Sequence, residues 1–275
     1  MNIYSYKVSE VEAYEKAVRL VGYIRRLEDF VIVDYIDGQY GHMGATIADA
    51  ILQAGTRYDT VVRPRVREIK NAYPEAGTTS GFWRLIEKGG AKRILRWMDD
   101  EKPNRVIALT RFLLNEHIET EDDLAVWLRD EANRPRLLEL RGIGPKTVDY
   151  LKILVGMQTT AADRYVFRLL DEAGAPAADY QEAKEILNLA ADAMGVERAP
   201  FDHSVWQYMS KRRRTALPKK GDLPPRGMEV DGPPPCSHCK LFNVDETRLL
   251  LSCRIYPDGI PQDIVTTATI CKDLI

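Results

Sequence analysis

Residues 137–156 (LLELRGIGPKTVDYLKILVG) place two glycines between two stretches of apolar residues at helical spacing. Gly142 and Gly144 supply the permissive backbone that a tight turn between two helices requires. Pro145 suits the first position of the second helix, because its missing N–H would have no partner there. Apolar residues then recur until Gly156, where the helix is expected to end. The segment therefore predicts a hairpin of two helices.

The turn of such a hairpin lies at the N-terminus of its second helix. Unpaired N–H groups and the helix dipole favour an anion at this position, such as a DNA phosphate. The candidate DNA contacts are Gly142, Ile143, Gly144, Lys146 and Thr147. Contacts of this kind position a protein on DNA without reading its bases.

Asp163 is expected to be the N-cap of the following helix, which ends before Gly174. A helix of about eleven residues rises about 16 Å, and the loop 157–162 spans about 20 Å when it is extended. The loop can therefore return the chain to the level of Lys146. A carboxylate at an N-cap stays ionised, whereas a partly desolvated lysine at a positive helix end has a lowered pKa. This pair suits an amine that attacks a carbon becoming cationic.

The motifs LRGIGPKT and ADRYVFRLL resemble the helix-hairpin-helix-GPD superfamily of DNA glycosylases, and specifically its endonuclease III branch. The resemblance implies that Lys146 is the Schiff-base nucleophile and that Asp163 is the catalytic carboxylate. Upstream, ATIADAILQAGTRYDTVV resembles an early helix of that family, which implies that Gln53 fills the gap left by an extruded base. RVIALTRFLL resembles the helix that precedes the hairpin, and the resemblance as a whole covers residues 45–210.

The function implied is base excision repair by a DNA glycosylase with lyase activity at apurinic or apyrimidinic sites. Its partner would be double-stranded DNA that contains a damaged base or an abasic site. In one alternative, Asp163 assists attack by water and Lys146 only contacts a phosphate. In another, the hairpin belongs to a non-catalytic DNA-binding protein. Asp163 by itself is most often a helix cap, so the catalytic interpretation depends on its combination with Lys146.

Helical periodicity dominates the chain, which predicts a mainly α fold. The resemblance implies a two-domain helix-hairpin-helix glycosylase architecture, with residues 45–155 as one bundle and 1–44 plus 156–215 as the other. Residues 216–235 are rich in proline and glycine and predict a linker, and residues 236–275 follow as a small metal-binding module. The expected elements are helices at 10–28, 45–54, 60–71, 80–88, 90–98, 103–115, 121–130, 179–194 and 201–213, and a short strand at 30–36.

All four cysteines, Cys236, Cys239, Cys253 and Cys271, lie beyond the linker. In a cytoplasmic chain, a Cys-x2-Cys pair with two further thiols favours a metal over disulfides. Structural zinc more often uses two close pairs, whereas one pair with two separate cysteines is compatible with an iron–sulfur cluster. The resembled family carries a [4Fe–4S] cluster after its catalytic helices, although in a more compact spacing. A [4Fe–4S] cluster is therefore expected, with Zn²⁺ or unligated thiols as alternatives and His238 as either an alternate ligand or a spacer.

The 275-residue chain has a formal net charge of −2, but its basic residues are clustered. Arg63, Arg65 and Arg67 form one group, and the run that contains Arg212 and Arg213 forms another; each is either a set of DNA-backbone contacts or solvated surface. The N-terminus carries charges where a signal peptide would be apolar, and no apolar run reaches membrane-spanning length. We therefore expect a monomer in the cytoplasm, associated with the nucleoid if the source is bacterial, and no membrane partner.

A few aromatic and imidazole side chains allow two interpretations each. Phe82 and Trp83 would stack on a flipped base or pack in the core, and Tyr58 is ambiguous in the same way. His203 would lie near DNA or be a hydrogen-bonded structural histidine.

Overall fold

The computed structural model describes residues 3–34, 36–212, 242–245 and 250–253. The chain divides into two compact units, Met1–Lys211 and Arg212–Ile275. The first unit is built from helices, which confirms the predicted mainly α class. None of the helices in the described part of the chain is both long enough and apolar enough to span a membrane.

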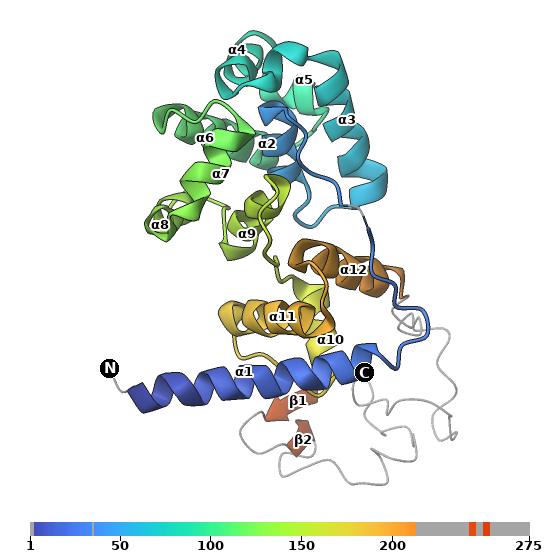
Figure 1. The fold of residues 1–275 in the computed structure, drawn as a ribbon. Helices are drawn as coiled ribbons and strands as arrows, with labels where there is room; N and C mark the ends of the chain where they lie inside the picture. Colours follow the sequence, from blue (N-terminus) through green and yellow to red (C-terminus); the bar gives the residue numbers. More distant parts are fainter. Residues whose placement is uncertain (1–2, 35, 213–241, 246–249, 254–275) are drawn as a thin grey trace, which may run out of the picture. The chain divides into compact units, whose positions relative to one another are not determined.

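Most elements of the first unit follow one another with short connections, but a long segment, residues 25–42, joins α1 to α2 (Figure 1). Its α-helices are α1 (Ile3–Ile24), α2 (Met43–Leu52), α3 (Arg63–Ala72), α4 (Thr79–Gly89), α5 (Ala91–Leu95), α6 (Glu101–Asn115), α7 (Glu121–Arg129), α8 (Arg134–Leu138), α9 (Pro145–Leu154), α10 (Arg164–Glu172), α11 (Tyr180–Met194) and α12 (Arg198–Lys211). Short turns of other helix types are η1 (Tyr58–Val62, π), η2 (Pro74–Gly77, 3-10) and η3 (Glu131–Asn133, 3-10). In the second unit, β1 (Phe242–Asp245) pairs antiparallel with β2 (Leu250–Cys253), with Phe242 opposite Cys253.

Helix α2 is buried along its whole length and lies in contact with α3, α4, α6 and α9 (Figure 1). It begins at His42, whose Nδ1 accepts a hydrogen bond from Ala45 N at 3.1 Å. Its apolar residues belong to a core that draws its members from residues 43–154. Two polar residues of α2, Thr46 and Asp49, are also completely buried. They need hydrogen-bond partners in the interior, and this requirement shapes the site described below.

Phe82 belongs to this core and is fully buried, which decides between its two interpretations in favour of packing. A Cβ atom added to Gly44 would lie 2.8 Å from the Phe82 ring, so the glycine allows α2 and α4 to approach. Trp83 packs against the same core while the guanidinium of Arg111 lies over its ring, 4.7 Å from the centroid.

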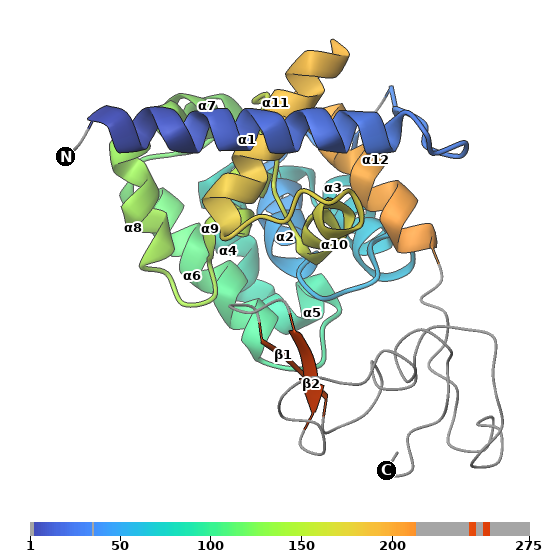
Figure 2. The ribbon, with the colours of Figure 1, turned by 90° about the horizontal axis from the view of Figure 1, so that it is seen from below.

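A second core is formed by residues of α1, α10, α11 and α12, between positions 13–24 and 162–209. Helix α1 lies against α11, as both views show (Figures 1 and 2). Leu20, Leu169 and Phe201 are fully buried there. The loop between α9 and α10 connects a helix of the first core to a helix of the second. It therefore determines where Asp163, at the start of α10, lies relative to Lys146 in α9.

The strand expected at 30–36 is not present in the described part of that segment, which is irregular. Phe30 instead packs on two rings of α12, Phe201 and Tyr208, with centroid distances of 6.4 and 5.4 Å. Val33 N donates to Ser204 Oγ at 2.9 Å. The apolar run therefore serves to pack against a helix, and a strand would need a partner strand that the described residues of the first unit do not contain.

The hairpin has the predicted turn. Gly142 has φ of +83°, a backbone conformation that favours glycine, and a Cβ atom there would lie 2.2 Å from Arg105 Nε, so the Arg105 side chain would have to move. Gly144 is the N-cap of α9, and Pro145 occupies its first turn. Helix α9 ends at Leu154, two residues before Gly156, whose φ is +82°.

Candidate active site

Two residues predicted for the site, Gln53 and Lys146, are in direct contact. Gln53 is the C-cap of α2, and Lys146 lies in the first turn of α9. Lys146 Nζ donates a hydrogen bond to Gln53 Oε1 at 2.6 Å. Gln53 Nε2 is buried and has no hydrogen-bond partner among the described residues. The contact between α2 and α9 thus joins two side chains that are far apart in the sequence.

The charge state of Lys146 is set by opposing effects. Burial lowers the pKa of the Lys146 amine below its ordinary value, while the negative charges of Asp163, Asp202 and Asp49 act to raise it. The positive charge of Arg164 adds a smaller lowering. A lowered pKa increases the fraction of neutral amine near pH 7, and only the neutral amine is a nucleophile.

Asp163 caps α10 as predicted. Its Oδ1 accepts hydrogen bonds from Tyr165 N at 2.7 Å and Val166 N at 3.3 Å. The side chain is partly buried. Because its charge acts on Lys146, the loop 157–162 returns the carboxylate to the neighbourhood of the amine.

Asp49, which the sequence analysis did not single out, lies one helical turn before Gln53. Its Oδ2 accepts hydrogen bonds from Tyr40 Oη at 2.5 Å and Tyr58 Oη at 2.9 Å, and its Oδ1 accepts one from Tyr150 Oη at 3.2 Å. Burial raises the pKa of Asp49 to about 6, although the three hydroxyl groups act to lower it. The signal available in the sequence was an acidic residue within the otherwise apolar segment ATIADAILQ.

Asp202 on α12 is the second carboxyl that the sequence analysis missed. Its Oδ1 accepts a hydrogen bond from Ala161 N at 3.1 Å. Burial raises the pKa of Asp202 to about 7, and the charge of Asp163 contributes to that rise. The charges of carboxyl groups from α2, from the N-cap of α10 and from α12 therefore all act on the amine of Lys146.

The aromatic and imidazole residues near this site pack on one another. Tyr58, in addition to its bond with Asp49, meets the ring of Trp206 edge-on, with centroids 6.0 Å apart. His203 packs on Trp206, and the centroids of the two rings are 5.2 Å apart. Burial lowers the pKa of His203, so its imidazole is predominantly neutral at pH 7.

The hairpin residues differ in what they offer to a phosphate. The side chains of Ile143 and Thr147 are buried, and their N–H groups donate within the hairpin, to Leu140 O at 2.9 Å and Gly144 O at 2.9 Å. The backbone at Gly142 and Gly144 is more accessible. A phosphate contact with the backbone of this turn would therefore depend on the two glycines and not on the N–H groups of Ile143 and Thr147.

Some arginines of the two predicted basic clusters have partners within the protein, and others are exposed. Arg63 forms ion pairs with Asp37 at 2.9 Å and Asp59 at 2.5 Å, so its charge is balanced within the protein. Arg65 donates to Val61 O at 2.7 Å and lies over the Trp97 ring, 5.4 Å from the centroid. Arg67 is exposed, as is Arg212 after the end of α12, whereas Arg213 lies outside the described residues.

The cysteine module falls mostly outside the described residues. Cys236, Cys239 and Cys271, together with His238, belong to the part that is not described, and Cys253 is the last residue of β2. In the described part of the chain, no group of three or more His, Cys, Asp or Glu side chains is arranged to hold a metal ion.

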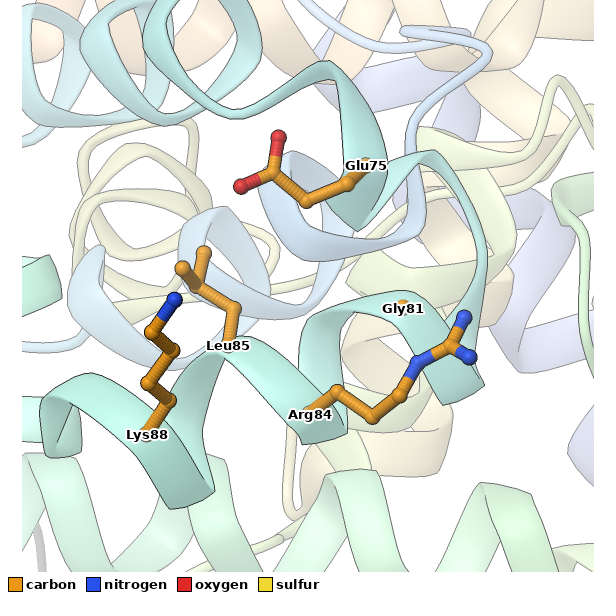
Figure 3. Close-up of a pocket in the computed structure, with 5 residues that line it drawn as sticks. All are labelled: Glu75, Gly81, Arg84, Leu85 and Lys88. Atoms are coloured by element: carbon orange, nitrogen blue, oxygen red, sulfur yellow. The ribbon is translucent and has the colours of Figure 1, made fainter.

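A surface groove of about 220 Å³ lies between η2 and α4, and it contains none of the predicted site residues (Figure 3). It is lined by Glu75, Gly81, Arg84, Leu85 and Lys88. A Cβ atom at Gly81 would lie 1.8 Å from Glu75 O, so the two backbone segments are in close contact there. The groove is thus a surface feature of this helix junction.

Comparison with known proteins places the chain in a fold and a family. The structure is similar to a crystal structure of the H. pylori 3-methyladenine DNA glycosylase MagIII bound to 1,N6-ethenoadenine, with a TM-score of 0.52 and 15% sequence identity. The similarity covers 74% of this chain and 99% of the other, and it shows that this chain has the helical helix-hairpin-helix glycosylase fold. No curated protein matches the sequence. A family model described as "Domain of unknown function (DUF8548)" matches residues 19–210, and because this is more than half of the chain, the chain belongs to that family.

Proposed function

We propose that the protein is a DNA glycosylase of base excision repair, which acts as a monomer on double-stranded DNA and also cleaves the strand at the resulting abasic site. The observation that carries the proposal is the arrangement around one amine. Lys146 Nζ contacts Gln53 Oε1, and the charge of the capping carboxylate of Asp163 acts on the same amine. A nucleophile, a charge-stabilising carboxylate and a residue at the end of a buried helix are the parts that such a reaction needs.

In the proposed reaction, the hairpin holds the DNA backbone while the damaged nucleotide leaves the stack and Gln53 takes its place. The neutral amine of Lys146 forms a bond to C1′ as the bond between C1′ and the base breaks, and the base leaves with the electron pair and takes up a proton. Asp163 stabilises the positive charge that develops on the sugar. Opening of the sugar ring gives a Schiff base, and loss of a C2′ proton with departure of the 3′ phosphate cleaves the strand.

The test is reduction with borohydride during incubation with a duplex that contains an abasic site. We expect a covalent protein–DNA adduct with the wild-type chain and none with Lys146→Gln. Lys88→Gln is the matched control, because Lys88 is an exposed lysine at the end of α4. An adduct that survives Lys146→Gln, or the absence of an adduct with the wild-type chain, would contradict the Schiff-base mechanism.

A second candidate keeps the glycosylase and assigns the attack to water, with Asp163 as the essential carboxylate. It is favoured by the 2.6 Å hydrogen bond between Lys146 and Gln53, in which the lysine acts as a donor. Base release without strand cleavage, abolished by Asp163→Asn and retained by Lys146→Gln, would select this mechanism. If the wild-type chain releases no base and Asp163→Asn leaves DNA binding unchanged, the protein is a DNA-binding module instead.

The damaged base is proposed from the fold neighbour, which is described as a 3-methyladenine DNA glycosylase bound to 1,N6-ethenoadenine. Duplexes with alkylated adenines are therefore the first substrates to assay, followed by those with oxidised pyrimidines, 8-oxoguanine and uracil. Release of the free base, measured by chromatography, identifies the substrate. If no base is released from any alkylated duplex, this chain has a different substrate from the one named for the fold neighbour.

We also propose that Cys236, Cys239, Cys253 and Cys271 bind a [4Fe–4S] cluster, with Zn²⁺ as the alternative. The proposal rests on their spacing in the sequence and on the cytoplasmic chemistry of thiols. Visible absorption and metal analysis of the purified full-length chain distinguish the two metals. A colourless protein with one equivalent of zinc supports the alternative, and a protein free of metal contradicts both.

A further inference from the structure

The loop between α9 and α10 is attached to α11 and α12 at three points. Each point pairs a residue of the loop with one or two residues of one of these helices. The contacts are Ala199 N to Gln158 Oε1 at 3.3 Å, Thr160 Oγ1 to Asn188 Oδ1 at 3.1 Å and to Lys184 O at 3.3 Å, and Ala161 N to Asp202 Oδ1 at 3.1 Å. Because the loop leads directly into Asp163, these contacts determine where the capping carboxylate lies.

Among these contacts with α11 and α12, the one made by Asp202 lies nearest to Asp163 in the sequence, and it is the one made by an ionisable side chain. The charges of Asp163 and Lys146 both act on Asp202, and so does that of Asp149 on α9. In return, the negative charge of Asp202 acts to raise the pKa of Lys146. Asp202 is thus linked to Asp163 through the backbone and to Lys146 through its charge.

We propose that Asp202 is a positioning residue for the Lys146–Asp163 pair: its carboxyl group fixes the loop that leads to Asp163 and adds a negative charge to the surroundings of the Lys146 amine. The catalytic role of the Lys146–Asp163 pair rests on the proposed function. The effect of the Asp202 charge on Lys146, however, is present in the protein without DNA and can be measured there. The charged groups that act on Lys146 are Asp49 from α2, Asp163 and Arg164 from α10, and Asp202 from α12. Of the three carboxylates, Asp202 is the one that also binds the loop.

The two effects are separated by two substitutions. Asp202→Asn keeps an oxygen that accepts from Ala161 N and removes the charge, so we expect the pKa of Lys146 to fall by about one unit while Asp163 stays in place. Asp202→Ala removes both effects, so adduct formation should also fall about tenfold or more at every pH. Glu197→Gln is the control, because this exposed carboxylate accepts from Gln158 Nε2 at 3.0 Å in the same loop and is not among the charges that act on Lys146.

The decisive measurement uses no DNA. The rate at which an amine-reactive ester acylates Lys146 is followed against pH by peptide mass spectrometry, and its midpoint reports the pKa of the amine. We expect the midpoint to move toward acid in Asp202→Asn and to stay at the wild-type value in Glu197→Gln. An unchanged midpoint in Asp202→Asn overturns the proposal, whereas the absence of a wild-type adduct with abasic DNA overturns only the Schiff-base function.

A reciprocal measurement covers the case in which Asp202→Asn does not fold. In Lys146→Gln, the loss of the positive charge should raise the pKa of the Asp202 carboxyl, which ¹³C NMR of the side-chain carboxyl group follows directly. The expected result is a rise relative to the wild-type protein. An unchanged titration would show that the two groups do not interact and would overturn the proposal.

Discussion

Asp49 and Asp149 are both completely buried carboxyls, but they have different partners. Asp49 on α2 accepts hydrogen bonds from three tyrosine hydroxyls, all of them neutral groups. Asp149 on α9 accepts from Lys184 Nζ at 2.6 Å and from Tyr180 Oη at 2.8 Å, with Arg134 at 3.4 Å. Cations balance the buried charge of Asp149, whereas hydroxyl groups only solvate that of Asp49.

The difference separates a structural role from a chemical one. The ionic network of Asp149 joins α9 to α8 and α11, so it connects the hairpin to the helices of the second core. Asp49 retains a titration near neutral pH, since burial raises its pKa to about 6. It also lies one helical turn from Gln53, and its charge acts on Lys146. Buried carboxyls with perturbed pKa values cluster at functional sites, and this is the one that the comparison selects.

The largest effect is expected for Asp149→Asn. The substitution removes the carboxylate charge that Lys184 and Arg134 contact in a largely buried environment, so the free energy of unfolding should fall by about 3 kcal/mol. Urea denaturation at pH 7.5 measures the loss. A change below about 1 kcal/mol would show that the network contributes little and would remove the contrast between the two carboxyls.

The hairpin itself could be predicted because its information is local. Gly142, Pro145 and Gly156 determine where helices begin and end, and Asp163 caps a helix through its own neighbours. The sequence also showed that Asp163 can return to the level of Lys146, since the loop 157–162 is long enough to span the rise of the helix before it. In the hairpin, the conformations that these residues prefer locally are the ones that the fold requires.

Asp49 and Asp202 could not be predicted in the same way. Their properties come from burial and from residues far away in the sequence, such as Tyr150 for Asp49 and Ala161 for Asp202. The wrongly predicted strand at 30–36 has a related cause, because its apolar residues pack on side chains of α12, and periodicity alone does not identify the packing partner.

For Asp49→Asn we expect a smaller change in unfolding free energy, and at pH 7.5 no loss of stability. The pKa of Asp49 is raised from 3.8 to about 6, so the folded state binds the proton more tightly, and this stabilisation is complete below about pH 4 and lost as the pH rises through 6. Relative to Asp49→Asn, which does not titrate, the wild-type protein should lose about 2–3 kcal/mol of unfolding free energy between pH 4 and pH 7. At pH 7.5 the variant should therefore be at least as stable as the wild-type protein.

The measurement is urea denaturation of both proteins at several pH values from 4 to 8, with Asp192→Asn as the control. Asp192 is a surface carboxylate paired with Arg198, which lowers its pKa, so that variant should show no loss of relative wild-type stability over this range. A pH-independent difference between wild type and Asp49→Asn would mean that Asp49 stays ionised throughout.

The smallest effects are expected when a single tyrosine hydroxyl is removed from each carboxyl, that of Tyr150 from Asp49 or that of Tyr180 from Asp149. Tyr150→Phe removes a donor that lowers the pKa of Asp49, so the midpoint of the Asp49 titration should rise by up to about one unit. Tyr180→Phe removes the corresponding hydroxyl from Asp149, but Lys184 Nζ still donates to that carboxylate at 2.6 Å. Both substitutions should cost about 1 kcal/mol in stability at pH 7.5, as expected for one hydrogen bond. The readouts are the carboxyl ¹³C shift of Asp49 against pH and urea denaturation of both variants. If the titration of Asp49 does not move in Tyr150→Phe, and Tyr180→Phe loses more stability than Tyr150→Phe, then the hydroxyl donor matters more at Asp149 than at Asp49 and the comparison is reversed.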